Sequence, residues 1–357
     1  MGASESSASG SRPRGRRRAA ALLAVVLLAG IIVFAVSRLN FERIGHALIT
    51  ASPGWLLLAL ALMATSLLLH SASWQQTLRA ALPDLHIPWP AVVRSAMIGV
   101  MASALLPGRI GEPTRVVVLT RRLDGSRRTL LPIVAGTVFS QTLINLVALA
   151  ALAVVTFTAV PLEHGHLTAV AVALAIPLAI CLLVLAGPRL LALGEQTRYA
   201  RVALIAQRTA ALLRLARRGL VVFARPRHGV PAVTFQLLAW ALQWLSCYAV
   251  LLAMGLADAA GLAGAAAILL AVNVSAVLPA TPSNVGVFQA ACLVVLAAYG
   301  VGAGPSLAYG IILQAIEVLT AVGLGIPALL GEGLTWSELR SGVSDSAGDD
   351  SAGQSAE

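Results

Sequence analysis

Apolar runs of about 20 residues recur along this chain and constrain its fold more than any other feature. Each run is close to the length that an α-helix needs to cross about 30 Å of hydrocarbon. Only 11% of the residues are charged, whereas about a quarter are charged in a soluble domain. We therefore expect an all-α polytopic membrane protein. The apolar segments lie at 19–37, 54–74, 88–106, 131–160, 167–187, 230–254, 262–279, 285–300 and 305–330.

The two ends of the chain are too polar to join this bundle. Residues 1–18 form a basic tail, and residues 339–357 form an acidic tail rich in Ser, Gly and Asp. We expect both tails to be disordered, because they cannot bury enough apolar surface. The run at 19–37 can span the bilayer and no clear cleavage site follows it, so we interpret it as an uncleaved signal anchor. Residues 19–338 are then a single transmembrane domain.

The arginines indicate the topology, because cytoplasmic loops carry an excess of basic residues. The basic N-terminus is expected in the cytoplasm of a cell with an inner membrane. If every apolar segment crossed once, the loop with Arg121, Arg122, Arg127 and Arg128 would face outward. We therefore interpret 88–120 as a re-entrant hairpin that enters and leaves on the cytoplasmic side. Both termini are then predicted to be cytoplasmic.

Two Pro- and Gly-bearing breaks interrupt the apolar segments, at Leu105 to Pro113 and at Leu278 to Gln289. Helices do not continue through such sequences. The second break predicts a hairpin that enters from the outer face. The expected fold has about six full spans plus two opposed re-entrant helical hairpins in an inverted repeat, although chance similarity of the two breaks is an alternative. The predicted hinge residues are Pro107, Gly108, Gly111, Pro279, Pro282 and Gly286.

Residues 188–229 form the longest polar interval, with nine arginines from Arg189 to Arg227 among leucines and alanines. This amphipathic pattern predicts a cytoplasmic linker that lies along the anionic inner leaflet. The arginines have no interleaved aromatic residues and no nucleic-acid-binding fold around them, so we expect no nucleic-acid partner.

Charged residues at the first break are the strongest candidates for a binding site. An ionisable group in the apolar region costs on the order of 3 kcal/mol or more unless it is paired or hydrated. Arg109 can bind a phosphate through two hydrogen bonds, with Glu112 and Arg115 beside it. The alternative is that both arginines snorkel to the headgroups and that Glu112 only pairs with one of them. Paired broken helices predict a site at the middle of the bilayer, so Thr281, Asn284 and Gln289 complete the predicted substrate-binding set.

Glu317 is an isolated carboxylate in the last apolar segment, with no arginine within one helical turn. It fits either a proton relay or a hydrogen bond between helices. Other polar residues of the apolar segments either line the same cavity or join helices together. On one predicted helical face these are Gln141, Thr142 and Asn145, and near the second break they are Asn273 and Ser275.

No sequence signature of an enzyme is present. The chain has no nucleotide-binding loop, no serine-hydrolase elbow and no metalloprotease motif. The three cysteines lie in apolar segments and the six histidines are scattered, so no metal or cofactor is expected. An intramembrane enzyme would have to use Glu112, Glu317 and distant histidines as acid and base. We expect no catalytic residues.

The stretch from Leu106 to Arg115 reads Leu-Pro-Gly-Arg-Ile-Gly-Glu-Pro-Thr-Arg. It resembles the signature of the flippase-like membrane family that includes the transmembrane region of lysylphosphatidylglycerol synthases. The second break resembles that family's Leu-Pro-x-Thr-Pro-Gly-Gly-x-Gly-x-Phe-Glu element. The resemblance covers most of residues 20–330 and implies a role in moving or presenting lipids, with relatives tied to aminoacylated phospholipids, hopanoids or polyprenyl-linked glycans.

The sequence departs from the family pattern at several ionisable positions. Ser283 and Asn284 replace the usual Gly-Gly, and Gln289 replaces Glu. Gln141, Thr142 and Asn145 stand where Glu, Arg and Asp are common. The soluble aminoacyl-transfer domain of the synthases is not found, so we do not expect lysyl transfer.

Two functions remain open from the sequence. The first is a translocase for an anionic phospholipid or polyprenyl-phosphate-linked lipid, which the paired breaks and their charged residues favour. The alternative is a non-transporting membrane partner that recruits or regulates a cell-envelope glycosyltransferase or lipid-modifying enzyme through the stretch from Arg189 to Arg227.

Overall fold

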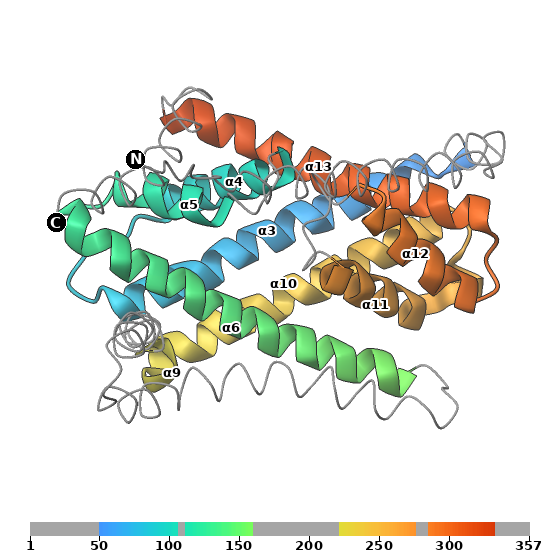
Figure 1. The fold of residues 1–357 in the computed structure, drawn as a ribbon, viewed down its shortest axis with the longest axis horizontal. Coiled ribbons are helices and arrows are strands. Elements are labelled where there is room, and N and C mark those ends of the chain that lie inside the picture. The colour runs from blue at the N-terminus through green and yellow to red at the C-terminus, as the bar shows by residue number, and fades with distance from the viewer. Residues whose placement is uncertain (1–49, 106–110, 160–220, 276–284, 333–357) are drawn as a thin grey trace, which may run out of the picture.

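The described part of the chain is built from α-helices, as predicted. The computed structural model describes residues 50–105, 111–159, 221–275 and 285–332 (Figure 1). The helices in these ranges are α3 (Pro53–Ala81), α4 (Trp89–Leu105), α5 (Gly111–Thr120), α6 (Arg127–Ala159), α9 (Val221–Ala224), α10 (Pro226–Ala253), α11 (Ala257–Ser275), α12 (Val287–Ala298) and α13 (Ala303–Glu332).

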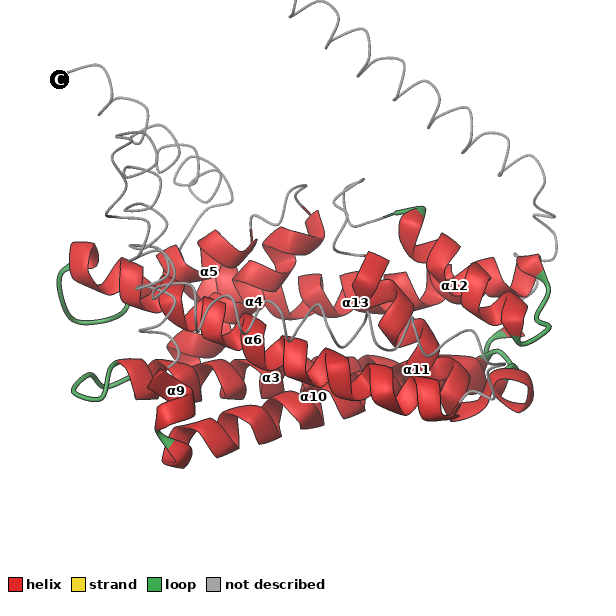
Figure 2. Cartoon of the chain, turned by 60° about the horizontal axis from the view of Figure 1, so that its bottom comes forward, coloured by secondary structure: helices red, strands yellow, loops and turns green. Residues whose placement is uncertain are grey.

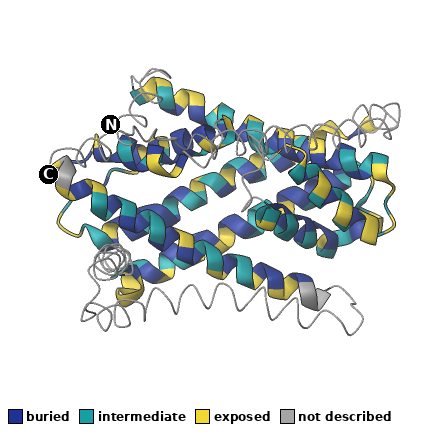
Figure 3. Ribbon diagram, in the orientation of Figure 1, coloured by how far each residue is buried: buried dark blue, intermediate teal, exposed yellow. Residues whose placement is uncertain are grey.

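The outer surface of the bundle is apolar. Five of the described helices, α3, α6, α10, α11 and α13, are long and apolar enough to cross a membrane. Figure 3 shows exposed and buried positions along the same helices. Large apolar side chains such as Leu57, Val294 and Leu330 are more than 60% exposed. Lipid tails cover such side chains without cost, so the chain is a multi-pass membrane protein.

The described chain consists of two similar halves. Each half is a long helix, two shorter helices and a second long helix, which are α3 to α6 in the first half and α10 to α13 in the second. Helices α3 and α10 pack side by side and run in opposite directions. The Ser52 N–H donates to the Ala253 carbonyl over 2.8 Å, and the Ser73 hydroxyl donates to the Ala232 carbonyl over 2.8 Å.

The packing between the halves is reciprocal. Helix α4 of the first half packs on α13 of the second, and α11 of the second half packs on α6 of the first. Because α3 and α10 are antiparallel, one half is inverted relative to the other. The predicted inverted repeat is therefore present in the described helices.

The short helices of each half form a hairpin, and the two hairpins point at each other (Figures 1 and 2). Helix α4 starts and helix α5 ends at one end of the bundle, whereas helix α11 starts and helix α12 ends at the opposite end. At 1.5 Å per residue, α5 is about 15 Å long and α12 about 18 Å, too short to cross a bilayer. Helix α11 has a kink at Gly261, where φ is 58°. The opposed hairpins were predicted correctly.

One end of the bundle carries the arginines. The Arg225 guanidinium at the start of α10 donates to the Ala80 carbonyl at the end of α3 over 3.1 Å. Arg122, between α5 and α6, pairs with Glu332 at the end of α13, with 2.5 Å between Nε and Oε2. Arg94 of α4 reaches the same carboxylate at 3.7 Å. The charge asymmetry that the sequence predicted is therefore present in the described helices.

Several predicted segments lie outside the described residues. Four of the six predicted full spans correspond to α3, α6, α10 and α13, and the other two, 19–37 and 167–187, are not described. The tails 1–18 and 339–357 are also outside. Of the linker predicted at 188–229, only residues from 221 onward are described. These residues are helical except Arg225, and α10 begins at Pro226 rather than near residue 230, because proline is favoured at a first helical position.

Candidate functional site

Two neighbouring cavities lie inside the bundle. The larger has a volume of about 290 Å³ and is lined by residues of α3, α4, α10, α11, α12 and α13. The smaller, of about 200 Å³, is lined by α3, α4 and α5. Leu67, Val100 and Ser103 line both cavities, so the two are adjacent. Each hairpin contributes to this interior space, as expected where broken helices line a cavity.

Arg115 is the cation of the smaller cavity. Its guanidinium forms an ion pair with Glu112 one turn earlier on α5, and Nη1 donates to the Gln141 Oε1 of α6 over 2.8 Å. The guanidinium carbon lies 4.8 Å from the ring centre of Trp74, a cation–π contact. The Arg115 side chain is only 14% exposed, so it does not reach the surface, whereas its ion pair with Glu112 agrees with the alternative interpretation of the sequence.

The hydrogen-bonding capacity of Arg115 is not fully used. Its Nε is buried and has no partner within the described chain. Glu112, by contrast, has a side chain that is 52% exposed, and both residues line the smaller cavity. A guanidinium carries five N–H donors in a fixed plane that matches carboxylate and phosphate. The smaller cavity therefore contains a cation, and the exposure of its partner Glu112 allows another anion to take the place of that carboxylate.

A close contact between α4 and α5 sets the position of Arg115. Gly111 begins α5 directly against Gly99 of α4. A Cβ atom added at Gly111 would lie 2.0 Å from the Gly99 carbonyl oxygen and 2.0 Å from the Ser103 hydroxyl. A Cβ added at Gly99 would lie 2.9 Å from the Arg115 Cβ. The two glycines therefore allow the hairpin arms to touch at its inner end.

A chain of polar contacts connects the two halves. The Gln141 Nε2 donates to the His70 carbonyl over 2.9 Å, and the His70 Nε2 lies 3.1 Å from the Gln243 Nε2. His70 and Gln243 occupy the same position when counted from the first residues of α3 and α10. Their contact therefore lies where the two halves of the inverted repeat meet. Through Gln243 the polar chain enters the larger cavity.

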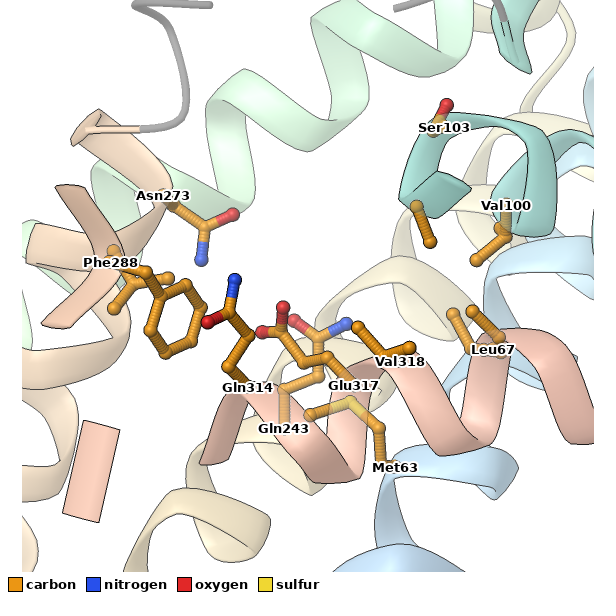
Figure 4. A pocket seen from close by; sticks show the side chains of 13 residues that line it. Met63, Leu67, Val100, Ser103, Gln243, Asn273, Phe288, Gln314, Glu317 and Val318 are labelled. Atoms are coloured by element: carbon orange, nitrogen blue, oxygen red, sulfur yellow. The ribbon is translucent and has the colours of Figure 1, made fainter. Parts of the chain in front are cut away.

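Glu317 is the charged residue of the larger cavity. Figure 4 shows its carboxylate close to the side chains of Gln243 and Gln314. No ion pair or hydrogen bond to Glu317 exists among the described residues. The Gln289 Nε2 donates to the Gln314 Oε1 over 2.5 Å, and the Gln289 Oε1 accepts the Gly286 N–H over 2.7 Å. Gln289 thus holds a wall of the cavity to the start of α12.

The structure places part of the predicted substrate-binding set. Glu112 and Arg115 line the smaller cavity, whereas Gln289 supports Gln314 and is not among the lining residues of either cavity. The predicted hinges Gly111 and Gly286 precede or begin α5 and α12. The remaining predicted residues lie outside the described ranges: Arg109, Thr281, Asn284, Pro107, Gly108, Pro279 and Pro282.

The polar face predicted on α6 is partly wrong. Gln141 is buried and binds Arg115, and Asn145 accepts hydrogen bonds from Gln236 and Trp240. Thr142 is instead exposed and donates to a carbonyl of its own helix. Asn145 therefore joins helices, which is the other role that the sequence left open.

Near the second break, Asn273 lines the larger cavity, whereas Ser275 donates to the Val272 carbonyl of its own helix.

Four residues of the site could not be predicted from the sequence, because nothing in the local pattern distinguishes them from polar residues that join helices. They are His70, Trp74, Gln243 and Gln314.

One comparison with known proteins gives a match. The family model described as lysylphosphatidylglycerol synthase TM region matches residues 21–325. No curated protein and no solved structure matches the chain. The matched range contains both hairpins and every residue that lines the two cavities.

Proposed function

The chain belongs to the family of the lysylphosphatidylglycerol synthase transmembrane region, and from this premise we propose that it is a translocase that moves a phosphate-bearing membrane lipid between the two leaflets. The observation that carries the proposal is the pair of adjacent cavities between two opposed hairpins, with a chain of polar contacts from Glu112 to Gln243 inside an apolar bundle. Polar groups at such a depth are costly and mark substrate pathways.

Arg115 is the proposed phosphate-binding residue. A lipid phosphate that enters the smaller cavity accepts hydrogen bonds from the guanidinium and replaces Glu112 as its anion. The exchange keeps the guanidinium paired at every stage, which avoids the cost of an isolated buried charge. Gln141 and Trp74 hold the guanidinium plane in place during the exchange. Arg109 of the same break is a second candidate for phosphate binding.

The proposal includes an orientation and excludes a catalytic role. The end of the bundle that bears Arg122 and Arg225 faces the cytoplasm of a cell with an inner membrane, by the positive-inside rule. The first hairpin then opens from the cytoplasmic side and the second from the outer side. Binding and movement of a lipid require no bond to be broken, so we propose a carrier and not an enzyme.

Reconstitution with a fluorescent lipid tests the proposal. Purified protein is placed in vesicles that contain a trace of phosphatidylglycerol labelled on an acyl chain, and dithionite is added outside. Vesicles without protein lose about half of the fluorescence, because only the outer leaflet reacts. Vesicles with the protein are expected to lose nearly all of it. A loss equal to that of protein-free vesicles, with polyprenyl phosphate as well as phosphatidylglycerol, would contradict the proposal.

The variant Glu112→Gln tests the exchange of anions. Glutamine keeps the shape of the side chain but no longer competes with phosphate for Arg115. Without the Glu112 carboxylate as a competing anion at Arg115, the affinity for lipid is expected to rise about tenfold. Release of the lipid is expected to become slower. Native mass spectrometry in detergent measures the first effect and the vesicle assay the second. Equal lipid retention and equal rates in wild type and variant would show that Glu112 does not compete with the lipid.

A further inference from the structure

The two halves of the repeat differ in charge at two pairs of corresponding positions. Gln141 and Glu317 occupy the same position when counted from the first residues of α6 and α13. Arg115 corresponds in the same way to Ala291 of α12. The first half therefore has a guanidinium next to a neutral amide, and the second half has a carboxylate and no cation at the matching position. Each half of the inverted repeat therefore has a charged residue where the other half has a neutral one.

The larger cavity offers hydrogen-bond acceptors around this carboxylate. The Asn273 Nδ2 donates to the Leu269 carbonyl over 2.9 Å, which leaves the Asn273 Oδ1 as an acceptor. The Gln243 Nε2 contacts the ring of His70, which leaves the Gln243 Oε1. Neither oxygen has a donor among the described residues. Two amide oxygens and the Glu317 carboxylate, shown together in Figure 4, therefore form a set of acceptors that suits a ligand that is both cationic and a donor.

The size and lining of the larger cavity fit an ammonium group with a short carbon arm. Its volume is about 290 Å³. A primary ammonium has three N–H donors, which equals the number of acceptor groups described above. The Phe288 ring lies on the wall of the cavity (Figure 4) and aromatic rings attract cations. Leu67, Val100 and Ser103 form the common wall with the smaller cavity, where Arg115 lies.

We propose that the larger cavity binds a primary ammonium group, and that the lipid headgroup extends across both cavities with its phosphate at Arg115 and its ammonium at Glu317. This inference rests on the proposed function and specifies its substrate class. The lipid is then an aminophospholipid with an ethanolamine-like headgroup, in which the two charges are separated by a short linker. The opposite charges of the two halves match the opposite charges of such a headgroup.

The experiment compares headgroups in the vesicle assay. Phosphatidylethanolamine, phosphatidylglycerol and phosphatidylcholine are each labelled on an acyl chain. Wild type is expected to move the ethanolamine lipid about tenfold faster than the glycerol lipid, and faster than the choline lipid, which has no N–H donor. Glu317→Gln is expected to bring the ethanolamine-to-glycerol ratio close to one. Asp258→Asn, which changes an exposed carboxylate in the first turn of α11, is the matched control and keeps the wild-type ratio.

Binding measurements separate this inference from the proposed function. Native mass spectrometry in detergent compares how well wild type and Glu317→Gln retain the ethanolamine and glycerol lipids. The melting temperature of both proteins is also measured in ethylammonium chloride and in sodium chloride. Selective retention of the ethanolamine lipid by wild type alone supports the ammonium site even if no lipid moves in vesicles, which would contradict only the translocase. Stabilisation by ethylammonium alone shows that the amine is sufficient. Equal preferences in both proteins, or equal stabilisation by sodium, would overturn the ammonium site.

Discussion

Replacing Arg115 by alanine is expected to slow lipid movement in proteoliposomes by about 100-fold. The substitution removes the cation of the smaller cavity together with its hydrogen bonds to Glu112 and Gln141. A hydrogen bond to a charged group contributes about 1.5–3 kcal/mol, and 1.36 kcal/mol corresponds to a factor of ten in rate. The rate at which dithionite removes the fluorescence of lipid from the inner leaflet of the vesicles measures the effect.

Two further variants define the cause of this loss. Arg115→Lys keeps the charge but not the planar fork, so an intermediate rate is expected. Arg121→Ala removes an exposed arginine beyond the end of α5 and is expected to keep the wild-type rate. If Arg115→Ala, folded as judged by its melting temperature, moved lipid as fast as Arg121→Ala, phosphate binding at Arg115 would be wrong.

Replacing Gly111 by alanine is expected to destabilise the protein by about 3 kcal/mol or more, because overpacking of a tight contact forces the backbone to shift. The new Cβ would lie 2.0 Å from the Gly99 carbonyl oxygen, and this oxygen cannot move away without moving α4. The melting temperature in detergent is expected to fall by roughly 5–10 °C. Lipid movement is expected to fall as well, since Arg115 lies one turn along α5.

Gly323→Ala is the matched control for this experiment. Gly323 is also a helical glycine, but a Cβ added there meets no atom within 4 Å. Alanine is favoured over glycine within a helix by about 0.5–1 kcal/mol, so the melting temperature of this variant is expected to stay equal or to rise slightly. Equal melting temperatures for the two alanine variants would show that the Gly99–Gly111 approach does not support the hairpin.

The spans and hairpins could be predicted from the sequence because their causes are local. Hydrocarbon thickness sets the length of an apolar helix, and proline with glycine ends it. The loop arginines also predicted that the two hairpins start at opposite ends of the bundle, since all charges in one loop share one side of the membrane. Gly111 and Gly286 were predicted as hinges from the same local pattern, and both lie at helix starts.

The contacts inside the site could not be predicted, because they depend on how helices rotate and cross. His70 and Gln243 are remote in sequence and meet only because α3 and α10 pack antiparallel. Trp74 of α3 contacts the guanidinium of Arg115 on α5, and this contact also depends on how the two helices pack. Thr142 was expected on the same face as Gln141, yet the two are adjacent residues about 100° apart around a helix, and only one of them faces inward. Sequence spacing alone does not decide which one.

Blocking the space between the two cavities tests most directly whether lipid passes through it. Ser103 lines both cavities and its side chain is accessible, so Ser103→Cys places a thiol at their junction. Vesicles with this variant are assayed before and after reaction with a bulky methanethiosulfonate reagent. Wild type, whose Cys247 and Cys292 are buried and whose Cys181 lies outside the described residues, is treated in parallel, as is Ser126→Cys at the exposed arginine-bearing end. We expect the reagent to stop lipid movement by Ser103→Cys and to leave the rates of the other two proteins unchanged. If Ser103→Cys moved lipid equally fast before and after complete modification, a lipid pathway between the hairpins would be contradicted.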